Sequence, residues 1–148
     1  MPPDFKIRVA EPNIEEEDAK AVYDAVKEEC LSGSGPYNKQ FEKDFAKYVG
    51  TKYAVTVNSG TAALHLSLEA LGIRDGDEVI TTSFTYAATS NVIILQNAKP
   101  IFVDIEDETF NLDPTKIEKE ITKKTKAIMP IHYAGQTCEM ELINEIAK

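Results

Sequence analysis

A turn of small and polar residues, NSGTAA at positions 58–63, is the strongest candidate for a ligand site. It follows a β-branched run at 53–57 and opens a stretch with apolar residues at helical spacing. The free amides in the first turn of such a helix, together with the helix dipole, attract an anion such as a phosphate. Gly60 lets a ligand approach the backbone, and the Thr61 hydroxyl adds a donor. These residue types also form ordinary helix caps, here through Ser59, so both interpretations stay open at this point.

The turn matches neither of two common nucleotide-binding motifs, because it lacks both GxGxxG and GxxxxGK[ST]. A helix terminus by itself contributes about 0.3–2 kcal/mol to the binding of an anion. Micromolar affinity requires about 8 kcal/mol. Other contacts must therefore contribute if this turn binds a phosphate.

Two further polar turns carry candidate residues: SFTY at 83–86 and HYAGQ at 132–136. Tyr86 can stack on a planar ring, an interaction of about 1 kcal/mol, or can pack beneath the edge of a sheet. His132 is of a type that exchanges protons near neutral pH, which suits an acid, a base or a ligand contact, and a structural role is the alternative. His65 stands inside a predicted helix and is expected to be structural.

Strands and helices alternate from about residue 52 onward. Strands are predicted at 53–57, 78–82, 100–104 and 126–131, and helices at 59–71, 85–96, 113–121 and from about 139. This alternation predicts βαβ units and an α/β fold with a mostly parallel sheet. The turns from strand to helix in such a sheet open at its C-terminal edge, where ligands bind. The three polar turns are therefore expected to meet there.

Two helices are predicted before this series. The first begins at a capping box formed by Asn13 and Glu16. The second ends at Gly50, a residue type that suits the left-handed C-terminal cap. The loop between them, SGSGPY at 32–37, is the most flexible stretch that the sequence predicts.

The composition is that of an ordinary folded protein, with 43% hydrophobic and 28% charged residues among 148. Sixteen basic and 25 acidic residues give a net charge of −9, which disfavours binding to nucleic acid or to an anionic membrane surface. No apolar run reaches the roughly 20 residues that span a bilayer, and Met1 opens a polar stretch, so a cytoplasmic location is expected. Cys30 and Cys138 stand outside any CxxC motif, and neither a disulfide framework nor a metal site is expected.

The C-terminal residues begin a helix that the chain does not complete. Met140, Ile143 and Ile146 form an apolar stripe, but Lys148 follows with no capping glycine and no further strand. A parallel sheet uses such a helix to cross to its next strand. We therefore expect the chain to be the N-terminal portion of a longer protein, truncated inside a βα repeat.

From about Ser32 to Lys148 the sequence resembles the N-terminal part of the DegT-type (DegT/DnrJ/StrS) sugar aminotransferases. The resemblance is carried by SGSGPYNKQFEKDFAKYVGTKYAV, VNSGTAALHLSLEALGIRDGDEVITTSFTYAATSN, AKPIFVDIEDETFNLDP and KAIMPIHYAGQTCEM. It implies a partial large domain of the aspartate-aminotransferase type (PLP fold type I) with pyridoxal 5′-phosphate (PLP) as cofactor. Residues 1–37 would form an N-terminal helix and active-site loop, and residues 38–148 the N-terminal part of the PLP-binding domain.

The resemblance also implies roles in binding the cofactor. Thr61 and Ala62 match the pair that holds the cofactor phosphate, beside Ser59 and Gly60. Tyr86 matches the aromatic residue that stacks on the pyridine ring. These assignments favour the anion site over a simple cap.

The substrate side of the site is implied in the same way. Ser34 and Tyr37 correspond to a loop at the mouth of the active site, and His132 and Gln136 correspond to residues that line the same cleft. The segment TFNLDP is similar to the corresponding segment of perosamine synthetases, which aminate a GDP-linked 4-keto-6-deoxy sugar. The implied partners are a nucleotide-linked keto-sugar and an amino donor, glutamate, in polysaccharide biosynthesis, and the implied assembly is a homodimer.

No catalytic residue is expected in this chain. The family's Schiff-base lysine and the aspartate that pairs with the pyridine nitrogen are expected beyond Lys148, and Lys124 and Lys126 do not stand in the matching sequence context. The chain alone is therefore expected to be inactive. Three alternatives stay open: a PLP-dependent sugar dehydratase of the same family, a non-catalytic nucleotide-binding module, and a structural domain whose polar turns are only caps.

Overall fold

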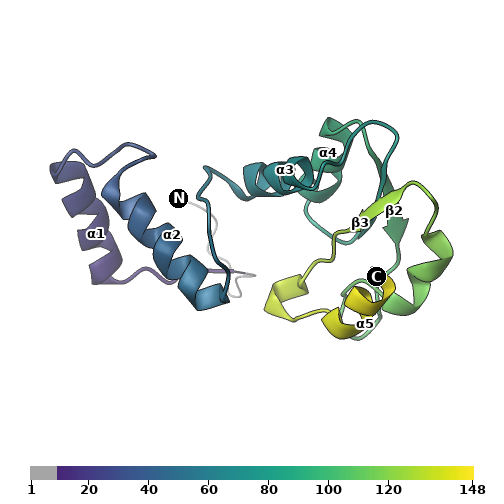
Figure 1. Ribbon diagram of the computed structural model, residues 1–148. Coiled ribbons are helices and arrows are strands. Elements are labelled where there is room, and N and C mark those ends of the chain that lie inside the picture. The colour runs from purple at the N-terminus through teal and green to yellow at the C-terminus, as the bar shows by residue number, and fades with distance from the viewer. Residues whose placement is uncertain (1–9) are drawn as a thin grey trace. The chain divides into compact units, whose positions relative to one another are not determined.

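The computed structural model describes residues 10–148, which divide into two units. The first unit ends at Thr56, and the second is Val57–Lys148 (Figure 1). The polar stretch that opens at Met1, and with it the first part of the predicted segment 1–37, lies outside the described residues. The functional division after residue 37 stays a prediction.

The first unit contains the two predicted helices, α1 (Glu16–Lys27) and α2 (Pro36–Val49). The predicted capping box of Asn13 and Glu16 is wrong, because the N-cap is Glu15, whose backbone N–H donates to Asp18 Oδ2 at 2.9 Å. The acidic run offers this spacing at several positions, so the pattern alone does not select one. The predicted end of α2 is confirmed, since Gly50 adopts φ +78° at the C-cap.

The predicted strand at 53–57 is wrong: the segment has no sheet partner among the described residues. Instead, the backbone N–H and the hydroxyl of Thr56 both donate to Glu42 Oε1, each at 2.8 Å. β-Branched residues favour an extended chain, but a strand also requires the backbone of a neighbour. In this protein the Glu42 side chain of α2 accepts these hydrogen bonds, and no neighbouring strand within residues 10–148 does so.

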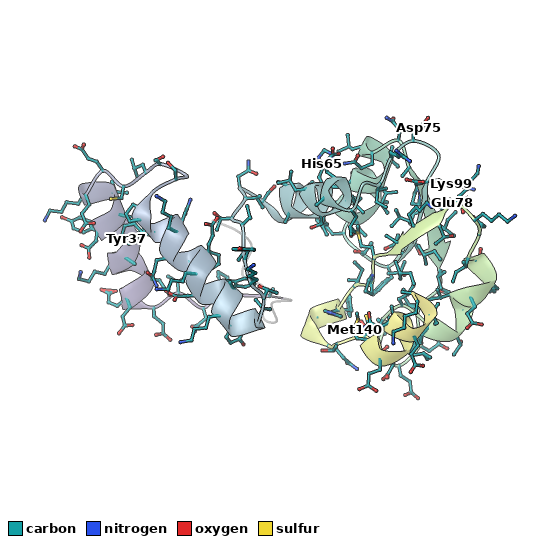
Figure 2. The ribbon with its side chains drawn as sticks, in the orientation of Figure 1. Tyr37, His65, Asp75, Glu78, Lys99 and Met140 are labelled. Atoms are coloured by element: carbon teal, nitrogen blue, oxygen red, sulfur yellow. The ribbon has the colours of Figure 1, made fainter. Side chains whose placement is uncertain are left out.

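The second unit is built on a parallel sheet in the order β2-β1-β3. The central strand β1 (Glu78–Thr82) pairs with β2 (Lys99–Val103) and with β3 (Thr125–Ile128), both in parallel. Figure 2 shows Glu78 and Lys99, which are paired at the start of their strands, side by side. The predicted α/β fold is confirmed, although β3 ends three residues before the predicted limit.

Helices α3 (Gly60–Ala70), α4 (Ala88–Leu95) and α5 (Met140–Ile146) lie close to the predicted positions. The helix predicted at 113–121 is wrong, because two 3₁₀ turns, η1 (Pro114–Lys116) and η2 (Glu118–Glu120), occupy that stretch. Pro114 and Ile117 are both buried, and residues three apart share a face in a 3₁₀ helix. Burial at that spacing favours the tighter turn over an α-helix.

The core has two clusters of buried apolar residues, one on each face of the sheet. Val79 belongs to one cluster and Ile80 to the other, because successive residues of a strand point to opposite faces. Cluster one consists of Leu68, Ile73, Val79, Val92, Ile93 and Ala98, and cluster two of Ile80, Val103, Leu112, Ile117, Cys138 and Ile143. The predicted stripes of α3 and α4 are correct at Leu68 and Val92, but Leu71 and Leu95 at the helix ends are exposed.

We predict that Ile93→Ala destabilises the protein by about 2–5 kcal/mol, because this side chain is 0% exposed in cluster one. The matched control is the next residue of α4, Ile94→Ala, whose side chain is 57% exposed and whose loss should cost less than about 1 kcal/mol. Urea unfolding followed by circular dichroism measures both values. If both variants lost the same free energy of unfolding, α4 would pack against the core through a different face.

A second prediction concerns pH. The backbone amide and the hydroxyl of Thr56 donate to Glu42 and hold the pKa of its carboxyl below the usual value of 4.5. This contact therefore stabilises the first unit at pH values above 4.5 and is lost as the pH falls through the lowered pKa. Amide exchange of Thr56 should accelerate, relative to its intrinsic rate, on acidification of the wild type. The Glu42→Gln variant should lack this acid-dependent change, and an identical pH profile in both proteins would refute the assignment.

Candidate functional site

The N-terminus of α3 combines a helix cap with free amides. Ser59 is the N-cap in an extended conformation, and its hydroxyl accepts the Ala62 N–H at 3.1 Å. Its carbonyl accepts the Ala63 N–H at 3.0 Å. Within residues 10–148, the amides of Gly60 and Thr61 have no hydrogen-bond partner. The cap and the anion site are therefore compatible, although a ligand that used the Ala62 amide would have to displace the Ser59 hydroxyl.

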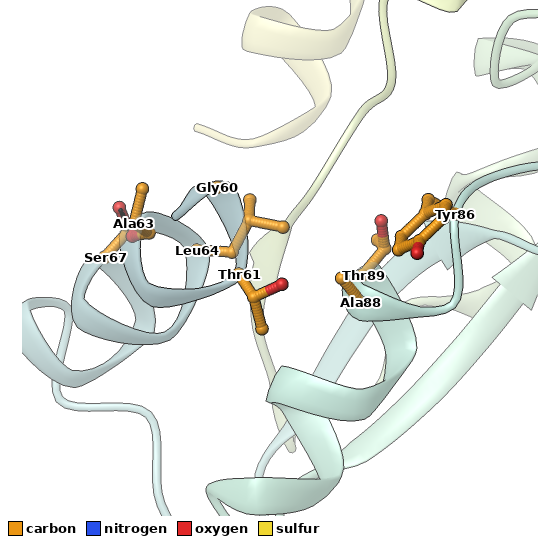
Figure 3. Close-up of a pocket in the computed structure, with 8 residues that line it drawn as sticks. All are labelled: Gly60, Thr61, Ala63, Leu64, Ser67, Tyr86, Ala88 and Thr89. Carbon is orange, nitrogen blue, oxygen red and sulfur yellow. Dashed lines mark hydrogen bonds between the residues drawn. The ribbon is translucent and has the colours of Figure 1, made fainter. Parts of the chain in front are cut away.

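A cavity of about 560 Å³ lies between the start of α3 and the start of α4. Its lining consists of Gly60, Thr61, Ala63, Leu64, Ser67, Tyr86, Ala88 and Thr89. Figure 3 shows the α3 residues on one side and Tyr86, Ala88 and Thr89 on the other. Tyr86 is 83% exposed, so its ring is available for stacking. The structure brings two of the three polar turns together here, and we call this space the first cavity.

The second cavity, of about 380 Å³, is lined by residues 83–86 and 131–134. Tyr86 lines both cavities, so the three polar turns follow one another along this edge of the sheet, as predicted from the parallel strands. His132 lines the second cavity, whereas His65, which is labelled on α3 in Figure 2, lines neither cavity. Gln136 also lines neither cavity.

The loop that carries His132 is held by its own residues. The imidazole Nδ1 of His132 accepts the Cys138 N–H at 3.2 Å, and the Cys138 thiol donates to the Ile131 carbonyl at 2.9 Å. Cys138 is buried, and burial raises the pKa of its thiol above 9.0. This thiol is therefore a structural group and a poor nucleophile.

The two predicted substrate residues near the N-terminus belong to the first unit. Tyr37 lies in the first turn of α2, and its hydroxyl donates to Glu28 Oε2 at 3.3 Å. Partial burial and the Glu28 carboxylate raise the pKa of Tyr37 above 10.0. Ser34 forms a hydroxyl–hydroxyl hydrogen bond with Ser32 at 3.0 Å. The roles of Ser34 and Tyr37 at a substrate site stay predictions.

Sequence reasoning missed two features beside the second cavity. Phe84, Phe110 and Tyr133 form an aromatic cluster with ring centroids 5.0–5.8 Å apart. Asn111 is buried and hydrogen-bonds to the backbone of Tyr133 and of Gln136. Both features join the segment after β2 to a loop more than 20 residues away, and no local pattern signals such a contact.

The first cavity fits a phosphorylated aromatic cofactor. Two free amides and the Thr61 hydroxyl can receive a phosphate, and a Cβ placed on Gly60 would meet no atom within 4 Å, so the approach there is open. Neither cavity is lined by a lysine or an arginine. The arrangement can therefore bind and orient a ligand, but it offers no amine for a covalent bond.

Two other classes of feature were sought in residues 10–148. No group of three or more His, Cys, Asp or Glu side chains is arranged to hold a metal ion within that range. None of the helices described there has the length and apolar character required to cross a bilayer.

Comparisons with known proteins agree with this geometry. The model of the DegT/DnrJ/EryC1/StrS aminotransferase family matches residues 12–148. The chain is 47% identical over 137 residues to the spore coat polysaccharide biosynthesis protein SpsC of Bacillus subtilis, covering 93% of this chain and 35% of that protein. It is 45% identical over 143 residues to the GDP-perosamine synthase of Caulobacter vibrioides, covering 97% of this chain and 38% of that protein.

A solved structure shows the same fold. NtdA from Bacillus subtilis with bound cofactor PMP matches with a TM-score of 0.84 and 39% identity, over 90% of this chain and 32% of that chain. The chain thus spans about a third of the length of the relatives that it matches. The predicted fold, part of the domain found in PLP-dependent aminotransferases, is confirmed. Since the family match covers nearly every described residue, the chain belongs to the DegT/DnrJ/EryC1/StrS aminotransferase family.

Proposed function

We propose that this chain supplies the phosphate- and ring-binding part of a PLP-dependent sugar aminotransferase. The observation that carries the proposal is the first cavity, whose lining includes Gly60 and Thr61, which have free amides, on one side and the exposed Tyr86 on the other. Thr61 and Ala62 bind the phosphate, Gly60 permits its approach to the backbone, Ser59 caps the helix start, and Tyr86 stacks on the pyridine ring. The cofactor supplies an electron sink for amino-group transfer, and these residues orient it.

The substrate of the longer protein is, in this proposal, a nucleotide-linked keto-deoxy sugar, with glutamate as the amino donor. Support comes from a relative named GDP-perosamine synthase and from another named for spore coat polysaccharide biosynthesis. Ser34, Tyr37, His132 and Gln136 are the proposed substrate contacts. The longer protein is proposed to be a cytoplasmic homodimer, and a sugar dehydratase of the same family is the alternative.

We predict that the chain alone binds PLP weakly. The two free amides and one hydroxyl of the first cavity face a phosphate without any cation in the lining. The helix terminus contributes about 0.3–2 kcal/mol, far below the 8 kcal/mol or so that corresponds to a micromolar dissociation constant. Titration followed by fluorescence or thermal shift should show saturation only well above micromolar concentration. NAD should give no response, and a tighter response to NAD than to PLP would favour a nucleotide-binding module.

The phosphate and ring contacts can be tested separately. Thr61→Val should weaken PLP binding about ten-fold, because a hydrogen bond to a charged group is lost, and should leave the binding of unphosphorylated pyridoxal unchanged. Tyr86→Ala should weaken both ligands about five-fold, whereas Tyr86→Phe keeps the ring and should bind like the wild type. If Thr61→Val affected pyridoxal and PLP equally, the phosphate assignment would be wrong.

We also predict no turnover. Because no lysine lines either cavity, borohydride treatment with PLP should not label one lysine stoichiometrically, as read by mass spectrometry. Amination of a nucleotide keto-sugar by the purified chain should be undetectable. Steady turnover, or a single fully labelled lysine, would contradict this part of the proposal.

A further inference from the structure

The wall of the second cavity opposite residues 83–86 is a short loop, 131–138, that we call the His132 loop. Its geometry is unusual at Ala134, which adopts φ +50°, followed by Gly135 at φ +85°. A left-handed conformation costs a residue with a Cβ about 1–2 kcal/mol. Other contacts must therefore hold this turn in place.

Asn111 supplies those contacts from a distant part of the chain. Its side chain is 2% exposed, and its Oδ1 accepts the Tyr133 N–H at 2.9 Å, while its Nδ2 donates to the Gln136 carbonyl at 3.2 Å. The two bonds bracket the left-handed turn on either side. A buried amide that uses both its donor and its acceptor on one loop fixes the position of that loop.

Asn111 is itself held in place. It lies next to Leu112, which is bridged to Ile105 in antiparallel fashion, and the Asn111 carbonyl accepts the Glu106 N–H at 2.9 Å. Its backbone N–H donates to Thr109 Oγ1 at 3.2 Å. The segment that follows β2 is thus a rigid support for the His132 loop.

The same loop determines which nitrogen of His132 carries the proton. Nδ1 accepts the Cys138 N–H, so in the neutral imidazole the proton is on Nε2. Among residues 10–148, none forms a hydrogen bond with Nε2. His132 lines the second cavity, and of its two ring nitrogens only Nε2 has no hydrogen-bond partner among the described residues.

We infer that Asn111 is a positioning residue that holds the His132 loop so that His132 offers Nε2–H as a fixed hydrogen-bond donor to an oxygen atom of the ligand. The positioning of the loop and the assignment of the His132 proton follow from the hydrogen bonds of Asn111 and His132 alone. Only the identity of the ligand, a sugar whose hydroxyl or carbonyl oxygen accepts the bond, rests on the proposed function. The aromatic cluster beside the cavity suits the apolar face of such a ring.

The test uses nuclear magnetic resonance of the 148-residue chain and needs neither cofactor nor turnover. The wild type should show a single His132 tautomer, with Nδ1 unprotonated and Nε2 protonated, and slow amide exchange at Tyr133 and Cys138. Asn111→Leu should accelerate exchange about ten-fold at Tyr133, which loses its acceptor, and also at Cys138, with which Asn111 forms no hydrogen bond. The His132 resonances should move toward a mixture of tautomers.

Two further variants separate positioning from stability. Asn111→Asp keeps an acceptor for the Tyr133 N–H but loses the donor to the Gln136 carbonyl, so it should protect the Tyr133 amide better than Asn111→Leu does and restore the single tautomer only in part. Thr122→Val removes a hydroxyl that donates to buried Glu78 at the start of β1, and it should lower the melting temperature without changing the His132 tautomer. If Asn111→Leu lowered the melting temperature but left the tautomer and the Cys138 exchange unchanged, Asn111 would be merely structural and the inference overturned.

The identity of the ligand is tested separately, with GDP-mannose as the probe and GDP as the matched control. Addition of GDP-mannose should shift the His132 Nε2 resonance, and the His132→Asn variant, which keeps an acceptor near Nδ1 but lacks the Nε2 donor, should bind the probe several-fold more weakly. An equal shift with GDP alone, or no shift, would overturn the sugar assignment. Failure of PLP to bind would instead count against the proposed function, so the two failures are distinguishable.

Discussion

The parallel pairing of β1 with β2 and β3 is the constraint on which the rest of the second unit depends. Parallel strands end at the same edge of a sheet, so the turns that follow them are brought together whatever their separation in sequence. That is why Tyr86, which follows β1, and His132, which follows β3, line one cavity. The two faces of β1 then anchor the helices that carry the remaining residues of the site.

The site on this edge is shaped by side chains that bind backbone. Ser59 takes up the Ala62 amide and leaves two others free, and Asn111 closes the turn that contains Ala134. Each of these hydrogen bonds adds only about 1 kcal/mol to the net stability of the protein. A conformation that left the same buried groups without a partner would lose more free energy than that. The hydrogen bonds therefore act mainly by selecting one conformation of the turn. The geometry of the candidate site therefore depends on the whole edge of the sheet and not on any single turn.

The lining of neither cavity contains a lysine or an arginine. Amides, hydroxyls and an aromatic ring can orient a phosphorylated ligand, whereas covalent attachment of an aldehyde cofactor needs an amine. The match covers 35–38% of the length of these relatives.

The sequence by itself determined the α/β class, the strand at 78–82, the cap at Ser59 and the three polar turns, because these follow from local periodicity and residue type. It misplaced the first cap and predicted a strand at 53–57, where tertiary contacts outweigh local propensity. Only the tertiary structure revealed Asn111 and the hydrogen bond that assigns the His132 proton. Those depend on contacts between segments distant in sequence, which residue patterns do not encode.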